Sequence, residues 1–283
     1  MYLNTGLMES FAKKLEQINR DYCFDVPPLE ATRDFTRDLV NLLFPIRQNR
    51  LLTAENILER LNSLRQQCYQ LIAVFGDRLP VPAMELTDRF FGKLPGIYEI
   101  LLDEADGYMK NDPAADSVEE VIMCYPGFFA VTVYRLAHAL HELGVPIMPR
   151  MMTEYAHSRT GIDIHPAARI GKKFFIDHGT GVVIGETTEI GEDVKIYQGV
   201  TLGALHVDKK LSDRKRHPTI GDRVIIYAGS TILGGTTVIG HDSIIGGNVW
   251  LTSSVDPYTV VYRKPKVMYR NQKGYSEPID WVI

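Results

Sequence analysis

The spacing of hydrophobic positions changes once along the chain and divides it into two regions. Before about residue 160 the apolar residues follow helical spacing, as in the segment from Leu52 to Gly76. Gly76 is expected to end that helix. Ser117 and Glu120 are spaced as a capping box and predict the start of another helix, which Pro126 interrupts. Further helices are predicted up to His141 and over residues 146–159. The first region is therefore expected to be all-α.

From Ile164 onward, aliphatic residues recur every six positions. The first run is Ile164, Ile170 and Ile176. After a slip of two residues the repeat continues with Ile184, Ile190, Ile196 and Leu202, and after an interruption with Ile220, Ile226, Ile232, Val238 and Ile244. A helix repeats at 3.6 residues and a strand at 2, so a period of six indicates a short flat face with one inward side chain and a corner. Three faces close a triangular coil of about 18 residues, and coils stack at the strand spacing of about 4.8 Å.

The six-residue repeat is interrupted between Leu202 and Ile220. The charged segment Leu205–Pro218 carries no aliphatic residue at a repeat position, which predicts a loop projecting from the stack. Loops on rigid scaffolds often carry binding and catalytic residues. We therefore expect an α+β chain: a helical domain at 1–160, a repeat domain at 161–262 with the loop 205–218, and a tail at 263–283.

Composition narrows the class of protein. The hydrophobic content of 45% and the charged content of 23% are typical of a globular chain, and the net charge is −4. A basic footprint of the kind that nucleic-acid binders carry is missing, and no apolar stretch is long enough for a membrane span. The three cysteines, Cys23, Cys68 and Cys124, lie far apart and form neither a disulfide framework nor a zinc-binding spacing. We expect a cytoplasmic protein that binds neither nucleic acid nor membrane.

The repeat and five separated motifs resemble a known enzyme family. The repeat is similar to that of the hexapeptide-repeat acyltransferases, and the motifs resemble serine O-acetyltransferase. The motifs are NDPAAD (111–116), DIHPAARIG (163–171), DHGTGVVIGET (177–187), VTLGAL (200–205) and RHPTIGD (216–222). The resemblance implies an N-terminal all-α domain followed by a left-handed parallel β-helix, assembled as a homotrimer or as a hexamer built from two trimers. It implies that the helical domain at 1–160 serves oligomerisation and forms part of the substrate site. It also implies transfer of acetyl from acetyl-CoA to L-serine, the first step of cysteine biosynthesis, with acetyl-CoA as cosubstrate and no tightly bound cofactor.

The resemblance assigns roles to particular residues. It makes His178 the general base and Asp163 its orienting partner, a chemistry that suits a histidine titrating near neutral pH. It places the substrate ammonium on Asp112 and Asp177. It places the substrate carboxylate on Arg216 and His217, and acetyl-CoA along Gly203, Ala204, Ala228 and Gly229, with no metal.

Two alternatives use the same residues. The chain departs from the family at Ala204, where a second glycine is usual, and in the stretch 259–267, which leaves the donor acyl group and the CoA contacts open. A hexapeptide-repeat acyltransferase with another hydroxyl acceptor, such as a sugar, is one alternative. A β-helical metalloenzyme similar to γ-class carbonic anhydrase is the other alternative. Its zinc would be held between subunits by three histidines, for which the chain offers His157, His165, His178, His206 and His217. His165 is expected to be a corner residue, and His138 and His141 to lie on helix faces.

The resemblance also carries two regulatory expectations. Free cysteine shares the ammonium and carboxylate of serine, so it is expected to compete for the same site. The tail ends in Trp281, Val282 and Ile283, which a solvated tail has no reason to carry. Through Ile283 it is expected to bind O-acetylserine sulfhydrylase, the next enzyme of the pathway.

Overall fold

The computed structural model describes residues 5–21, 26–205 and 214–264. Residues 206–213 of the predicted loop, with His206, and the tail residues 265–283, with Ile283, lie outside the described residues, so the expectations that fall on them stay predictions. The helices are α1 (Thr5–Asp21), α2 (Leu29–Leu43), α3 (Ala54–Ala73), α4 (Ala83–Asn111), α5 (Val118–Cys124), α6 (Pro126–Glu142) and α7 (Met148–Thr160), with 3₁₀ helices η1 (Pro45–Gln48) and η2 (Gly76–Arg78). None of the described helices has both the length and the apolar character that crossing a membrane requires.

Local signals in the sequence set several helix boundaries. The predicted capping residue Ser117 accepts a hydrogen bond from the amide of Glu120 at 3.1 Å and starts α5. Pro126 stands at the first position of α6, where its missing amide costs nothing. The helix predicted within 52–76 is confirmed as α3, and η2 begins at Gly76.

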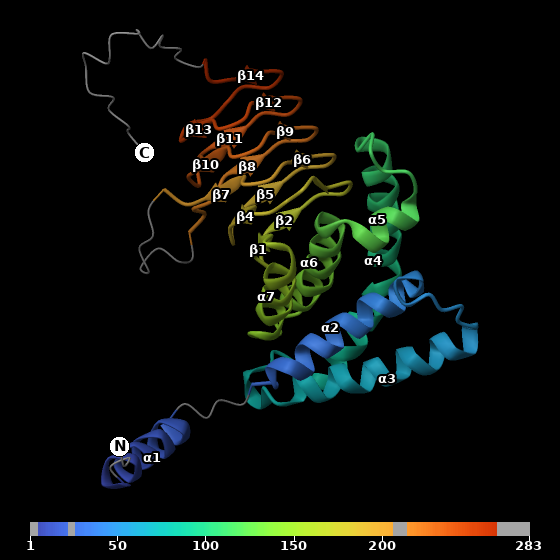
Figure 1. Ribbon diagram of the computed structural model, residues 1–283, viewed down its shortest axis with the longest axis vertical. Helices are drawn as coiled ribbons and strands as arrows, with labels where there is room; N and C mark the ends of the chain where they lie inside the picture. The colour runs from blue at the N-terminus through green and yellow to red at the C-terminus, as the bar shows by residue number, and fades with distance from the viewer. Residues whose placement is uncertain (1–4, 22–25, 206–213, 265–283) are drawn as a thin grey trace.

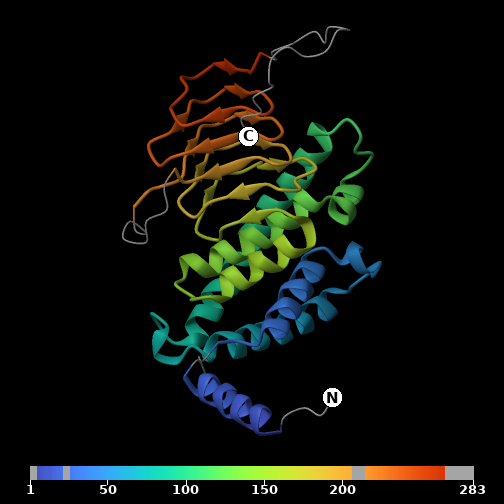
Figure 2. The ribbon, with the colours of Figure 1, turned by 60° about the vertical axis from the view of Figure 1, so that its left-hand side comes forward.

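The second half of the chain winds as successive coils through three sheets, and within each sheet the paired strands are parallel (Figures 1 and 2). Sheet A contains β1 (Asp163–Ile164), β4 (Val183–Ile184), β7 (Thr201–Gly203), β10 (Thr231–Leu233) and β13 (Trp250–Leu251). Sheet B contains β2 (Arg169–Ile170), β5 (Glu189–Ile190), β8 (Thr219–Ile220) and β11 (Val238–Ile239). Sheet C contains β3 (Phe175–Ile176), β6 (Lys195–Ile196), β9 (Ile225–Ile226), β12 (Ile244–Ile245) and β14 (Val260–Val261). The predicted class, a helical region followed by a left-handed parallel β-helix, is confirmed.

The register of the coils differs from the predicted six-residue repeat at two positions. Val183 pairs with Thr201, a step of 18 residues, but Thr219 pairs with Val238, a step of 19. The corner after β10 thus holds one extra residue, which turns Val238 outward, where it is 44% exposed. Ile239 and Ile245 are fully buried instead, so the inward positions predicted at Val238 and Ile244 are wrong by one residue.

Helix α6 joins the two hydrophobic cores. Ala130, Val131 and Tyr134 of α6 pack into the β-helix core, whereas its other buried residues belong to the helical core. The Tyr134 hydroxyl donates to the carbonyl of Ala168 at 2.5 Å. A side chain at Gly127 would lie 2.2 Å from the carbonyl oxygen of Ile176, so only glycine lets α6 approach the first coil this closely. Helix α6 therefore closes the lower end of the β-helix (Figure 1).

A buried ion pair fastens this junction. The Arg135 guanidinium donates to the carbonyls of Ile170 (2.6 Å) and Gly171 (2.5 Å) in the first coil and pairs with Glu104 of α4. The Glu104 side chain is fully buried. Burial raises the pKa of Glu104, and the charge of Arg135 opposes that rise. One guanidinium thus connects α4, α6 and the first coil.

We expect Arg135→Ala to destabilise the protein by about 3–5 kcal/mol, because it leaves the Glu104 carboxylate buried without its partner. Denaturant unfolding measures this directly. Arg65→Ala is the matched control, because Arg65 pairs with Asp88 on the surface, where both side chains are about half exposed. The control should cost less than about 1 kcal/mol. Equal losses in the two variants would contradict a fastening role for Arg135.

Candidate active site

The predicted site residues lie at two different corners of the coil. The C–A corner joins a strand of sheet C to the next strand of sheet A, and the A–B corner joins sheet A to sheet B. Asp177 and His178 follow β3 and belong to the C–A corner, whereas Arg216 and His217 precede β8 and belong to the A–B corner. A face of about five residues at about 3.3 Å each puts the two corners on the order of 15 Å apart. One amino acid cannot touch both corners of a single coil.

Asp112 comes to the C–A corner from the helical region. It is the C-cap residue of α4. Its Oδ1 accepts a hydrogen bond from the Ala114 amide at 2.8 Å, and its Oδ2 accepts one from the Tyr125 hydroxyl at 2.5 Å. These two bonds, and then the nearby charge of His178, lower the pKa of Asp112. The carboxylate is therefore held ionised beside His178, as a site for an ammonium group requires.

Tyr125 is a site residue that the sequence did not single out. Its hydrogen bond to Asp112 raises the pKa of the phenol, and the charge of Asp177 adds to the rise. Tyr125 is the N-cap residue of α6, directly before Pro126. The sequence offered one signal for Tyr125: a proline restricts the backbone conformation of the residue directly before it.

His178 stands open to solvent at this corner. Its side chain is 70% exposed, and its Nδ1 lies 3.5 Å from Oδ1 of Asp177. Its φ of +55° is unusual for a residue with a Cβ, but Asn248 adopts the same angle at a later C–A corner. The backbone conformation therefore comes from the corner, and it projects the imidazole outward where a substrate can reach it.

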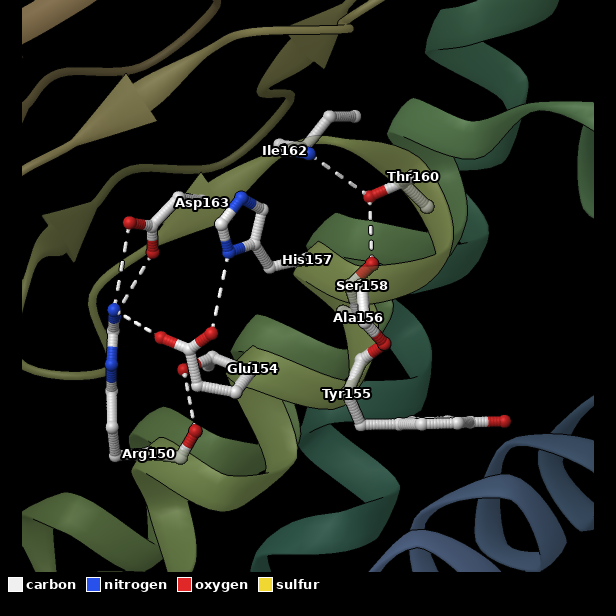
Figure 3. Close-up of polar contacts among 10 residues, drawn as sticks. Arg150, Glu154, Tyr155, Ala156, His157, Ser158, Thr160, Ile162 and Asp163 are labelled. Atoms are coloured by element: carbon white, nitrogen blue, oxygen red, sulfur yellow. Dashed lines mark hydrogen bonds and ion pairs between the residues drawn. The ribbon is translucent and has the colours of Figure 1, made fainter.

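Asp163 is held by a different partner from the predicted one. Its Oδ1 and Oδ2 accept hydrogen bonds from the Arg150 guanidinium at 3.0 and 3.5 Å, as Figure 3 shows. Arg150 also pairs with Glu154, whose other oxygen lies 3.3 Å from Nδ1 of His157. Among the contacts of the described residues, none joins Asp163 to His178, so their pairing stays a prediction.

The register of the first coil offsets His178 from Asp163. Asp163 is in register with Val183, a step of 20 residues, because the C–A corner between β3 and β4 is long. His178 lies within that corner and not directly above Asp163. Asp177 is the carboxylate beside the imidazole in this chain.

The metal alternative finds a different set of side chains. Within the described ranges, the one cluster that could hold an ion is Glu154, His157 and Asp163. It contains a single histidine, and Arg150 already supplies a positive charge to both carboxylates (Figure 3). This cluster within one chain is not the three-histidine site of the alternative, whose zinc would lie between subunits, and His206 lies outside the described part.

At the A–B corner, Thr187 organises Arg216 and His217. The Thr187 hydroxyl oxygen accepts hydrogen bonds from the amides of Arg216 (2.9 Å) and His217 (3.1 Å). The Arg216 guanidinium pairs with Glu186. The A–B corner therefore holds the planar guanidinium of Arg216 in place shortly before β8. Such a group binds carboxylates well because it can donate two parallel hydrogen bonds.

His217 is neutral in the folded protein. Its Nδ1 accepts a hydrogen bond from the Thr187 amide at 3.1 Å, so the ring proton is on Nε2. Burial, and then the charge of Arg216, lower its pKa to about 4. A Cβ at Gly185 would lie 2.2 Å from Nε2, so glycine at that position makes room for the ring. His217 can thus act as a neutral donor through Nε2–H.

The remaining histidines match their structural expectations. His165 Nδ1 accepts from the Ala167 amide at 3.2 Å, which makes it a corner residue. His138 and His141 lie on α6, where Nδ1 of His138 donates to the carbonyl of Pro166 at 2.7 Å. Their hydrogen bonds and positions are those of packing residues.

The residues assigned to acetyl-CoA flank sheet A on both sides. Gly203 ends β7 and Ala204 follows it at the A–B corner, whereas Ala228 and Gly229 lie at the C–A corner before β10. A Cβ at Gly229, which has a φ of +71°, would lie 2.4 Å from Oδ1 of Asn248. The small residues keep the backbone accessible on these corners, and their role towards the cosubstrate stays a prediction.

Comparisons with known proteins agree on one family. The chain is 53% identical over 178 residues to a plasmid-encoded serine acetyltransferase of Synechococcus elongatus, a match that covers 61% of this chain and 56% of that protein. It is 49% identical over 173 residues to the serine acetyltransferase of Mycobacterium tuberculosis, covering 61% of this chain and 73% of the relative. The chain belongs to the serine acetyltransferase family. No protein-family model matches it.

A solved structure extends the likeness to the fold. Serine acetyltransferase 1 of Entamoeba histolytica, in complex with L-cysteine, superposes with a TM-score of 0.73 and 39% identity, covering 84% of this chain and 87% of that one. The helical region is therefore shared with this serine acetyltransferase as well. The alignment with the Synechococcus relative spans just over half of that protein.

We expect His217 to remain neutral down to about pH 4 in the folded serine acetyltransferase chain. In the unfolded chain its pKa returns to about 6.5, so between these values the unfolded state binds the extra proton. The contribution of His217 to the free energy of unfolding is therefore complete above about pH 6.5 and falls as the pH drops towards 4. Nuclear magnetic resonance of the ring nitrogens should show the Nε2–H tautomer at pH 6, and a ring that is protonated at that pH would contradict this assignment.

Proposed function

We propose that the protein is a serine O-acetyltransferase that converts L-serine and acetyl-CoA into O-acetyl-L-serine and CoA, the step that commits serine to cysteine synthesis. Membership of the family supports this proposal. The observation that carries it is the convergence of Asp112, from the helical region, with Asp177 and His178 at one corner of the first coil. Two carboxylates beside an exposed imidazole suit a substrate that presents an ammonium group next to a hydroxyl.

In the proposed reaction His178 is the general base. Its free ring nitrogen takes the proton of the serine hydroxyl as the oxygen attacks the thioester carbonyl. The tetrahedral adduct then collapses, the C–S bond breaks, and the imidazolium returns its proton to the CoA sulfur. Asp177, 3.5 Å from Nδ1, is in place to hold the imidazolium. Asp163 stays the proposed second partner, and it would have to be shared with Arg150.

The proposed site is completed by a second subunit. Within one chain the acids of the C–A corner and the guanidinium of the A–B corner are separated by a whole face of the coil. A cyclic trimer places the C–A corner of one subunit against the A–B corner of the next, because each subunit offers both surfaces. Asp112 and Asp177 of one subunit would then hold the ammonium, while Arg216 and His217 of its neighbour hold the carboxylate.

Competition by cysteine follows from the same recognition. A site that reads the ammonium and the carboxylate accepts cysteine as well as serine, and the related Entamoeba histolytica enzyme was solved in complex with L-cysteine. Sugars and other uncharged alcohols lack both charges. They would leave Asp112 and Asp177 without a counter-ion, so the proposal predicts selectivity for amino acids.

The direct test is release of CoA from acetyl-CoA, measured against a panel of serine, other hydroxy amino acids and sugars. His178→Ala should lower turnover by about 10²–10⁴-fold while leaving the affinity for CoA nearly unchanged, because removal of a general base affects the reaction and not donor binding. His138→Ala, on the face of α6, is the control. A sugar preferred over serine would overturn the acceptor, and more than a tenth of wild-type turnover in His178→Ala would overturn the base.

Mixing two inactive variants tests the shared site. We expect His178→Ala and Arg216→Ala to be nearly inactive alone, the latter through a raised KM for serine. At a serine concentration that saturates the wild type but lies far below the KM of Arg216→Ala, their co-assembled mixture should recover about a quarter of wild-type turnover, because each interface draws its two halves independently from different subunits. If the whole site lay within one chain, no subunit of the mixture would be intact and activity would stay at the level of the single variants.

A further inference from the structure

A column of aromatic side chains continues the C–A corner above Asp177. The backbone amides of Asp177, Tyr197 and Tyr227 each donate a hydrogen bond to a carbonyl of the coil above. The acceptors are the carbonyls of Ile196 (2.9 Å), Ile226 (3.0 Å) and Ile245 (2.8 Å), respectively. Asp177, Tyr197 and Tyr227 thus occupy the same position in successive coils. The two tyrosine rings stack with centroids 5.0 Å apart and planes 16° from parallel.

The lower ring of this column reaches the substrate end of the site. Burial raises the pKa of Tyr197, and the neighbouring Tyr227, Asp177 and Asp112 raise it further in that order. The phenol of Tyr197 therefore lies within electrostatic reach of both carboxylates of the C–A corner. The upper ring, Tyr227, is 41% exposed and directly precedes Ala228.

The space below the column is closed by the helical region. The buried Tyr108 hydroxyl accepts a hydrogen bond from the Ile176 amide at 2.9 Å, and α6 approaches the carbonyl of Ile176 so closely that Gly127 cannot carry a side chain. The helical region therefore packs under this corner, and the column of Tyr197 and Tyr227 is the surface that an acyl donor with its thioester at His178 meets above it.

We propose that Tyr197 and Tyr227 form the wall against which the pantetheine arm of the acyl donor lies, which makes them binding residues for the donor. The inference rests on the proposed function and adds two residues to it. A tyrosine offers a flat apolar face for methylene and amide groups and a hydroxyl for hydrogen bonding, and it loses little rotamer freedom on binding. The column ends at Gly246, whose position lies against Tyr262 of the coil above.

The test measures donor binding separately from turnover. Tyr227→Ala should weaken CoA binding, measured by calorimetry, by about five- to twentyfold and raise the KM for acetyl-CoA in parallel, with the KM for serine within about twofold of wild type. Tyr227→Phe keeps the flat face and should stay within about threefold. Tyr258→Ala is the matched control, because Tyr258 is 75% exposed and lies before β14, on the far side of sheet C from the column.

Two outcomes would overturn the proposal. CoA affinity within twofold of wild type in Tyr227→Ala would show that the ring does not contact the donor. Dissociation of the oligomer in Tyr227→Ala, seen by analytical ultracentrifugation, would show that the column is a contact between copies of the chain. Because calorimetry with CoA needs no acceptor, failure of the serine assay in the wild-type protein would overturn the proposed function without deciding the role of Tyr227.

Discussion

The docking of α4 and α6 on the first coil is the contact on which the site depends. A stack of coils has an open lower end, and α6 closes it with apolar side chains while Arg135 ties two carbonyls of the coil to the buried Glu104. The same docking carries the C-cap of α4 to the corner that holds His178. Without it Asp112 would be an ordinary turn residue, hydrogen-bonded to Ala114 and remote from any catalytic group.

The backbone of the stack determines how side chains can be combined. Because each strand pairs in parallel with the strands of the coils above and below, a corner residue is continued by the same position in the next coil, and residues on different corners never meet within a chain. This constraint builds columns such as Asp177, Tyr197 and Tyr227. It also separates the acids Asp112 and Asp177 from the Arg216 guanidinium, so the proposed substrate, which carries two opposite charges, would need two subunits.

The sequence predicted the parts of the fold that repeat. Six-residue spacing revealed the coil, and capping signals revealed α5, because both depend on residues close together in the chain. The displacement of Val238 and Ile244 from the core could not be predicted, since it arises from one added residue in a corner. The hydrogen bonds from Arg150 to Asp163 and from Tyr125 to Asp112 depend on how the helices pack against the coil. Neither the six-residue repeat nor the helix-capping signals contain that information. Motifs placed His178 and Asp177 together, but only the structure separates them from Arg216.

The charged groups of the site already have partners before any substrate binds, and this bears on selectivity. Asp112 accepts from Tyr125, and Arg216 pairs with Glu186. These contacts hold the side chains in place, which reduces the ordering cost of binding. A ligand is therefore favoured only if it improves on them, and a zwitterionic amino acid does so at both ends, with an ammonium for the acids and a carboxylate for the guanidinium. An uncharged alcohol offers neither exchange, and the neutral His217 adds no cation that could attract a simple anion instead. In the proposed function, selectivity for an amino acid would thus follow from replacing existing contacts and not from filling an empty charged cleft.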